Sequence, residues 1–173
     1  NYPKFYEYFK EKEFTWDRTG GDPITQGNRN PLLYKNIGVD GIKTGFLTVE
    51  QYSLAASLKR NQRRITSVAS GFKSKNSRSR ESAKALNWGL KSFDTIEISL
   101  KDRVFTNLDA WLGKKKDFEV VAGEDFYLTI PKRKKKTIKA ILEYEGPILA
   151  PIKKGDKVAI LNVFVSGELT KQI

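Results

Sequence analysis

Three residue types are missing from this chain of 173 residues, which has no cysteine, no histidine and no methionine. Without cysteine and histidine, thiol catalysis, histidine-based acid/base chemistry and ordinary zinc sites are excluded. Serine, lysine, tyrosine and the carboxylates remain as candidate chemical groups, and we expect neither a metal nor a cofactor. The missing methionine means that residue 1 is not a natural initiator, so we expect a processed protein or a fragment.

Long apolar runs are missing as well. No stretch approaches the roughly 20 apolar residues of a membrane-spanning helix. The first residues, N-Y-P-K, have neither the charged nor the apolar region of a secretory signal. At this length the chain can bury a core, either as one domain or as two small ones.

Positive charge is in excess, with a formal net charge of +12. Residues 1–93 carry 17 lysines and arginines against 8 acids, a net +9, whereas residues 94–173 carry 15 against 12, a net +3. This balance predicts attraction to an anionic partner, which could be a nucleic acid, an anionic membrane surface or an acidic polymer.

The first half of the chain has mixed helical and strand patterns. Phe5, Tyr8 and Phe9 have helical spacing behind Pro3, which predicts a short amphipathic helix over residues 2–12 that packs through these aromatic side chains. We then expect a strand at 13–16, a loop at 19–23 and a turn at 28–31 that leads into a short buried segment.

An antiparallel meander is predicted next. Residues 39–47, 52–59 and 64–71 alternate as strands with short links, and the turn between the last two is at 60–62. Ser77 or Ser79 is suited to cap a following helix, in which Leu86, Leu90 and Phe93 recur at i, i+4 and i+7. That helix should lie across the sheet.

The pattern changes to short strands at residue 94. We expect about six strands, a small sandwich, and a domain boundary that divides residues 1–93 from residues 94–173, which makes the fold class α+β. The lysine-rich run at 132–136 lies between two of these strands and has no interleaved aromatics, so we interpret it as a solvated hairpin loop. The expected strands are 95–98, 103–108, 118–121, 126–130, 138–144 and 158–165.

Lys43-Thr44-Gly45 is the stretch that suggests chemistry. A lysine, a hydroxyl and a glycine in a row can form an anion-binding rim on a strand, and K-T-G is one signature of the serine penicillin-binding enzymes. Gly41 and Gly45 bracket the pair, and glycine is unfavourable in a strand unless something approaches the backbone closely. Strict alternation would point Lys43 and Thr44 to opposite faces, so both can serve one site only at a sheet edge.

Two further matches to penicillin-binding motifs are rejected. Ser70-Gly71-Phe72-Lys73 fits S-x-x-K and residues 74–76 fit S-x-N. The S-x-x-K serine must start a helix so that its lysine lies one turn on, but Ser70 ends a predicted strand. The order is also wrong, because K-T-G comes last in that superfamily.

Over residues 2 to about 160 the sequence resembles the carboxy-terminal part of a D-alanyl-D-alanine carboxypeptidase, a low-molecular-mass penicillin-binding protein. It departs from that family at Leu47, where the family has threonine, and at Gln51, where it has glycine. The matching segments are 10–16 (K-E-K-E-F-T-W), 28–33 (N-R-N-P-L-L), 39–45 (V-D-G-I-K-T-G), 52–57 (Y-S-L-A-A-S), 78–82 (R-x-x-E-S), 88–89 (W-G), 122–124 (A-G-E), 129–131 (T-I-P) and 150–155 (A-P-I-K-K-G).

The resemblance implies the last part of a penicillin-binding or β-lactamase-like catalytic domain, an antiparallel sheet with packed helices, followed by a small all-β sandwich domain. It implies a periplasmic serine acyl-transfer enzyme, peripheral to the inner membrane. Such an enzyme removes the terminal D-alanine from peptidoglycan stem peptides and is acylated by β-lactams.

The resemblance also implies roles for individual residues. Lys43 would supply positive charge, Thr44 would bind the substrate's terminal carboxylate, and Gly45 would let the substrate lie along the strand. The backbone N–H of Phe46 would be one of two oxyanion-hole donors. Arg78 would orient the carboxylate end, with a structural ion pair as the alternative role for this residue.

No catalytic residue of the family is expected within this chain, because its nucleophilic serine, the lysine and the S-x-N loop lie upstream of K-T-G. We therefore expect the isolated chain to be inactive, with the missing part of the catalytic domain as a partner, either as a separate chain or by swapping. A membrane anchor would follow residue 173. The alternative is a non-enzymatic cell-wall or protein-binding module that uses the β-domain, and nucleic-acid binding ranks last.

Overall fold

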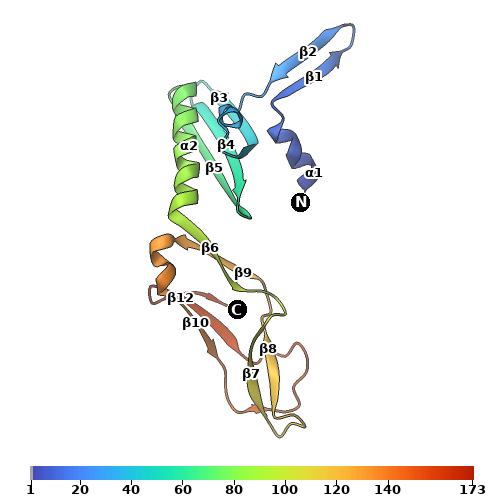
Figure 1. Ribbon diagram of the computed structural model, residues 1–173, viewed down its shortest axis with the longest axis vertical. Helices are drawn as coiled ribbons and strands as arrows, with labels where there is room; N and C mark the ends of the chain where they lie inside the picture. Colours follow the sequence, from blue (N-terminus) through green and yellow to red (C-terminus); the bar gives the residue numbers. More distant parts are fainter. Residues whose placement is uncertain (1) are drawn as a thin grey trace. The chain divides into compact units, whose positions relative to one another are not determined.

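The computed structural model describes residues 2–173, apart from the side chain of Arg18. The chain divides into two compact units, Asn1–Ser92 and Phe93–Ile173. The division falls one residue before the position at which the sequence pattern changes to short strands. The two units are described separately (Figure 1).

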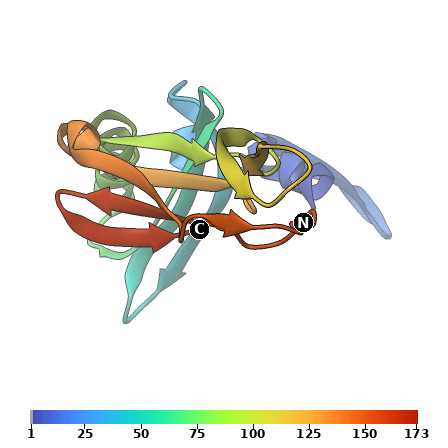
Figure 2. The ribbon, with the colours of Figure 1, turned by 90° about the horizontal axis from the view of Figure 1, so that it is seen from below.

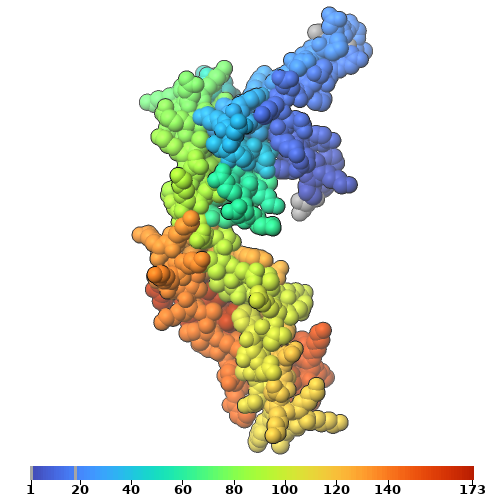
Figure 3. All heavy atoms as spheres, viewed as in Figure 1, coloured from blue at the N-terminus to red at the C-terminus, as the bar shows by residue number. Residues whose placement is uncertain are grey.

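Unit 1 begins with a short helix and a hairpin. The helix α1 spans Pro3–Tyr6 and continues as the 3₁₀ helix η1, Glu7–Lys10. The strands β1, Glu13–Arg18, and β2, Gly21–Gly27, pair antiparallel. The expected loop at 19–23 is therefore too long, since β2 already begins at Gly21. Figure 3 shows this blue segment protruding from the rest of unit 1.

The predicted packing face of the first helix is wrong. Phe5 and Tyr8 are 63% and 71% exposed, and it is Tyr6 that is half-buried. A 3₁₀ helix has three residues per turn rather than 3.6, so the face that meets the sheet rotates away from the α-helical stripe. Phe9, the third residue of that stripe, does approach the sheet, beside Gly41.

The expected meander is confirmed. After the 3₁₀ helix η2, Pro31–Tyr34, come the strands β3, Val39–Leu47, β4, Gln51–Arg60, and β5, Arg63–Phe72. They form an antiparallel sheet in the order β3-β4-β5. The predicted turn at 60–62 is present, and Asn61 and Gln62 adopt the positive φ angles that close it.

The helix α2, Lys75–Ser92, follows β5 and starts earlier than expected. Its cap is Ser74, whose Oγ accepts a hydrogen bond from the backbone N–H of Ser77 (3.1 Å), while Ser77 Oγ accepts one from Ser74 N–H (3.0 Å). Ser77 is thus the reciprocal partner of the cap, and Ser79 lies buried inside the helix. Phe93, expected in the helix, is the first residue of the next strand.

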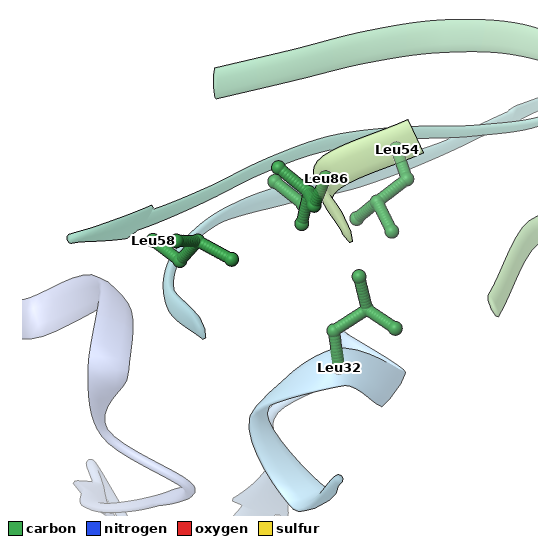
Figure 4. Packing of buried hydrophobic residues seen from close by; sticks show 5 residues of the cluster. Leu32, Leu54, Leu58 and Leu86 are labelled. Atoms are coloured by element: carbon green, nitrogen blue, oxygen red, sulfur yellow. The ribbon is translucent and has the colours of Figure 1, made fainter. Parts of the chain in front are cut away.

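The core of unit 1 lies between α2 and one face of the sheet. Leu54 and Leu58 of β4 meet Leu32 of η2 and Leu86 of α2, and all four are at most 1% exposed (Figure 4). Each fully buried leucine stabilises the fold by about 1.5–3 kcal/mol. This packing fixes which face of the sheet α2 covers.

Unit 2 is a small β-domain, and the α+β fold class is confirmed. All six expected strands are present, together with two short ones, β11 and β13, that the pattern does not predict. The eight strands are β6 (Phe93–Ser99), β7 (Val104–Trp111), β8 (Asp117–Val121), β9 (Phe126–Pro131), β10 (Ile138–Glu143), β11 (Ile148–Leu149), β12 (Ile160–Val165) and β13 (Glu168–Gln172).

Two of its three sheets form the sandwich. The pair β6-β9 and the sheet β10-β12-β13 enclose the core of this unit, in which Leu128 and Ile130 of one sheet pack with Leu161 and Val163 of the other (Figure 2). The lysine-rich run is not a loop but the 3₁₀ helix η3, Lys132–Thr137, and no residue in it is buried. Its solvated character is as expected.

Candidate functional site

The Lys43-Thr44-Gly45 stretch lies on β3, which among the described strands pairs with β4 alone. Thr44 is opposite Leu54, a core residue, so Thr44 belongs to the face that α2 covers. Lys43 is opposite Ala55 and belongs to the other face. The two side chains therefore leave the strand on opposite faces, and only the position of β3 at the edge of the described sheet would allow both to line one site.

Lys43 is exposed at this edge. Its Nζ donates a hydrogen bond to the carbonyl oxygen of Thr44 at 2.7 Å, which folds the side chain back along the strand. The structure gives it no ion pair with any acidic group in residues 2–173. The ammonium group is thus available to an anion that approaches the edge.

Gly45 lies close to the side chain of its cross-strand neighbour. It is opposite Ser53 on β4, and a Cβ added at Gly45 would collide with Ser53 Oγ. A side chain at this position would push the two strands apart or displace the hydroxyl. Glycine therefore keeps the surface of β3 flat beside the lysine and the threonine.

Phe46, Tyr52 and Arg78 form a stack on the α2 face of the sheet. The rings of Phe46 and Tyr52 are opposite each other across β3 and β4, with centroids 4.7 Å apart. Arg78, in the first turns of α2, places its guanidinium carbon 5.6 Å from the centre of the Tyr52 ring. The sequence did not single out Tyr52, although it lies in the matched Y-S-L-A-A-S segment.

The guanidinium of Arg78 is buried and poorly satisfied. The residue is 7% exposed, and its Nε has no hydrogen-bond partner within the described part of the chain. Burial lowers the pKa of Arg78, and the electrostatic influence of Tyr52 opposes this shift only in part. The alternative role as a structural ion pair finds no support, since no acid in residues 2–173 pairs with Arg78.

The turn next to this stack contains both departures from the family pattern. Leu47 is 65% exposed at the end of β3. Gln51, where the family has glycine, has a φ of 55°, in the left-handed region that favours glycine. The backbone at position 51 thus has a conformation that glycine favours, although this chain has glutamine there.

The rejected serine motifs have no catalytic geometry. Ser70 lies within β5 and Lys73 follows the end of that strand, so the pair does not start a helix. Ser74 caps α2 and its Oγ is bonded to Ser77. Within residues 2–173 no three acidic side chains gather as a metal site, and no described helix has the length and apolar character of a membrane span.

A separate groove of about 650 Å³ lies within unit 2. Glu143, Tyr144, Glu145 and Lys157 are among the residues that line it. None of the site residues predicted from the sequence lines it.

Two family models match the chain. The D-alanyl-D-alanine carboxypeptidase model matches residues 1–74, which include the Lys43-Thr44-Gly45 edge, and the model of the penicillin-binding protein 5 C-terminal domain matches residues 93–173. The chain belongs to the D-alanyl-D-alanine carboxypeptidase family. Arg78 lies in the segment between the two matches.

Relatives in this family cover nearly the whole chain. D-alanyl-D-alanine carboxypeptidase DacC of Escherichia coli is 37% identical over 98% of this chain and 42% of its own length, and DacA of the same organism is 35% identical over 98% and 41%. Penicillin-binding protein 5 of Haemophilus influenzae is 32% identical, with a TM-score of 0.80 over 99% of this chain and 49% of its own. The chain thus spans about two fifths of the length of these two curated relatives, 42% of DacC and 41% of DacA.

Proposed function

We propose that this chain forms the carboxylate-recognition wall of a serine-type D-alanyl-D-alanine carboxypeptidase. The substrates would be peptidoglycan stem peptides, and β-lactams would acylate the same site. The intact enzyme would work in the periplasm, held at the inner membrane by a peripheral anchor.

The observation that carries this proposal is the buried guanidinium of Arg78, which has neither an ion pair nor a partner for Nε among the described residues. A buried cation is costly unless an anion or hydrogen-bond acceptor satisfies it. It lies over Tyr52, on the face of the sheet that also carries Thr44. A substrate carboxylate at this place would supply the missing acceptor, through the two-oxygen geometry that guanidinium groups favour.

The other residues have complementary roles in the proposal. Lys43 supplies positive charge at the open edge of β3, and the Thr44 hydroxyl donates to the same terminal carboxylate. Gly45 leaves room for an extended peptide along the strand. The backbone N–H of Phe46 stabilises the tetrahedral intermediate as one of the two oxyanion-hole donors.

The nucleophile is assigned to a region outside residues 1–173. Ser70, the serine of the S-x-x-K match, lies in a strand and has no helical lysine partner. Acyl transfer needs a nucleophile, a base and oxyanion donors in one constellation, so the chain alone releases no D-alanine. The rest of the catalytic domain is then the partner of the β3 edge, in the same polypeptide, in a separate one or through a swapped copy.

A chimera tests this proposal. The part of Escherichia coli DacC that this chain does not span is fused ahead of residue 1, and D-alanine release and labelling by a fluorescent penicillin are measured. We expect both activities in the chimera and neither in the isolated chain. Lys43→Ala should reduce acylation of the chimera about a hundredfold.

Lys73→Ala is the matched control in the chimera, because Lys73 belongs to the rejected S-x-x-K match and should be dispensable. A penicillin label on a serine of the isolated chain would contradict the assignment of the nucleophile. Equal activity of the Lys43 and Lys73 variants would contradict the role of the β3 edge.

The groove of unit 2 favours a second candidate function, a cell-wall or protein-binding module. Tyr144 is 51% exposed and lines this groove, as do its sequence neighbours Glu143 and Glu145. Co-sedimentation of the whole chain with cell-wall sacculi tests it. Tyr144→Ala should weaken binding, whereas Tyr127→Ala, which alters a similarly exposed tyrosine of the same unit, should not.

A further inference from the structure

Asp40, Arg64 and Tyr6 form a polar cluster on the face of the sheet opposite α2. The carboxylate of Asp40 accepts hydrogen bonds from both terminal nitrogens of Arg64, Nη1 to Oδ1 and Nη2 to Oδ2, each at 2.7 Å. The hydroxyl of Tyr6 donates to Asp40 Oδ1 at 2.9 Å and accepts from Arg64 Nη1 at 2.9 Å. Paired two-point contacts of this kind fix geometry more firmly than a single ion pair.

These three residues come from three separate elements. Tyr6 belongs to α1, Asp40 to β3 and Arg64 to β5, and Arg64 Nη1 also donates to Ser57 Oγ of the intervening β4 at 2.9 Å. The cluster therefore bridges from the edge strand across its only described neighbour to the next strand. We call Tyr6, Asp40 and Arg64 the β3 clamp.

The position of Asp40 in its strand explains what the clamp can do. The pairing with β4 passes from Val39, opposite Leu58, to Gly41, opposite Ser57, so Asp40 is the extra residue of a bulge. A shift of one residue in a strand sends every side chain to the other face. The bulge therefore decides that Thr44 faces α2 and Lys43 faces away.

The start of β3 also packs against the N-terminal helical segment. The Tyr6 ring lies against the Arg64 guanidinium, with its centre 4.6 Å from the guanidinium carbon. A Cβ at Gly41 would come within 3.1 Å of both Phe9 Cβ and Tyr6 Oη, so the helical segment rests directly on the bulged strand. Glycine at position 41 allows this approach.

From these contacts we propose that the β3 clamp is a positioning device that sets the register of β3 and thereby the faces taken by Lys43 and Thr44. Among the described strands β3 pairs with β4 alone, and it contains two glycines, Gly41 and Gly45. Register is weakly specified in Gly-rich strands, so the pairing with β4 needs a further constraint. The bidentate contact that reaches over β4 to Arg64 supplies the missing constraint. The consequence for carboxylate recognition rests on the proposed function, but the register itself does not.

Amide hydrogen exchange and cross-strand contacts in the NMR spectra of the whole chain test this proposal. In Asp40→Asn, amide exchange at residues 42–47 should accelerate about tenfold or more, because asparagine has no negative charge and only one oxygen to accept from Arg64. The contact between Thr44 and Leu54 should weaken. Exchange in α2 and β5 should stay within about twofold, so a general loss of stability is distinguishable.

Glu81→Gln is the matched control, since it makes the same carboxylate-to-amide change in a partly exposed, ion-paired residue of the same unit. It should leave β3 unchanged. Tyr6→Phe keeps the ring over Gly41 and removes only the hydroxyl, so it gives a smaller acceleration confined to β3 and serves if Asp40→Asn does not fold. Unchanged exchange at residues 42–47 in the folded variants, or an equal rise in α2, overturns the proposal.

The DacC chimera separates the clamp from the proposed function. If the chimera is active, Asp40→Asn should slow its acylation by penicillin about tenfold and Glu81→Gln should not, whereas equal rates would show that the clamp does not position the site. If the unaltered chimera is inactive, the carboxypeptidase proposal fails, and the exchange experiment still decides the role of the clamp.

Discussion

Arg64 and Arg78 lie on opposite faces of the sheet β3-β4-β5, and they differ in what they contact. On one face Arg64 is paired with Asp40 at two points and with Tyr6 and Ser57 besides. On the other face Arg78 is more deeply buried, lies over Tyr52 and has no acidic partner in the described chain.

This difference suggests a structural role for Arg64 and a ligand-binding role for Arg78. A cation whose partners are all supplied by the fold contributes to structure, so Arg64 acts on the position of β3. A buried cation without an anion is unfavourable for the fold, and groups of this kind are common at functional sites, which is why we propose a ligand for Arg78. The contrast between Arg64 and Arg78 can therefore be tested by changing each side of the sheet in turn.

The largest effect is expected for Leu86→Ala, which removes the packing that holds α2 and Arg78 on the sheet. Leu86 is 0% exposed, and its truncation should lower the free energy of unfolding of unit 1 by about 2–5 kcal/mol. Urea unfolding followed by tryptophan fluorescence measures this. Leu47→Ala, at an exposed position, should change the free energy by no more than about 0.5 kcal/mol.

The arginines themselves should respond unequally. Arg64→Met leaves the half-buried carboxylate of Asp40 without its ion-pair partner, with only the Tyr6 hydroxyl as a side-chain donor, and should destabilise the chain by about 1–3 kcal/mol. Arg78→Met loses its contact with Tyr52 but removes a buried unpaired charge, so the change should stay within about 1 kcal/mol. Parallel urea titrations of the two variants compare them, and equal costs would remove the distinction between the two faces.

Acidification should weaken the contacts of Asp40 with Arg64 and Tyr6. Burial would raise the pKa of Asp40, but hydrogen bonds from Arg64 and Tyr6 outweigh it and hold that pKa below its usual value of 3.8. A carboxyl with a depressed pKa contributes stability above its unfolded-state pKa and loses it as pH falls through the lower folded value. Glu7 and Lys10 are the other charged groups that interact with this cluster.

We therefore expect the stability difference between the native chain and Asp40→Asn to be constant near neutral pH and to shrink below about pH 4. Thermal unfolding between pH 6 and 2 measures it. A difference that grows on acidification would mean that the sign of the shift is wrong.

The smallest effect is expected at the turn beside the Arg78 stack. Gln51 has a positive φ, which is unfavourable for glutamine and favourable for glycine. Gln51→Gly should relieve this strain but make the unfolded chain more flexible, so the net gain in the stability of unit 1 should be roughly 0.5–1 kcal/mol. Gln26→Gly, in strand β2, should instead destabilise it. Thermal unfolding of the two variants is sufficient, and the same sign for both would contradict the backbone explanation.

Much of the fold follows from local pattern. The strands of the meander and the six main strands of unit 2 alternate with period two over their own length, so the sequence alone places them within a few residues. The register of β3 does not follow in this way, because the bulge at Asp40 depends on Arg64, which lies 24 residues further on. The predicted packing of Phe5 and Tyr8 was wrong for a different reason, since the helix continues as a 3₁₀ helix from Glu7 and loses the α-helical period.

The candidate site was predictable where short motifs and the family resemblance carry it. Lys43, Thr44 and Gly45 could be placed on a strand that needs an open edge, and β3 provides one. The lack of an acidic partner for Arg78 in residues 2–173 could not be predicted, because it depends on where the fold places each of the acidic residues that the structure describes. The cap at Ser74 was missed because Ser77, its partner, is an equally good capping residue by type.

The most direct test of the central claim is a titration of the chain with D-alanyl-D-alanine and, separately, with its carboxy-terminal amide, followed by NMR at Thr44, Phe46 and Arg78. We predict saturable shifts with the free carboxylate, much weaker ones with the amide, and loss of the difference in Arg78→Met. Equal responses to the acid and the amide, or shifts that persist unchanged in Arg78→Met, would contradict the claim that this face recognises a substrate carboxylate.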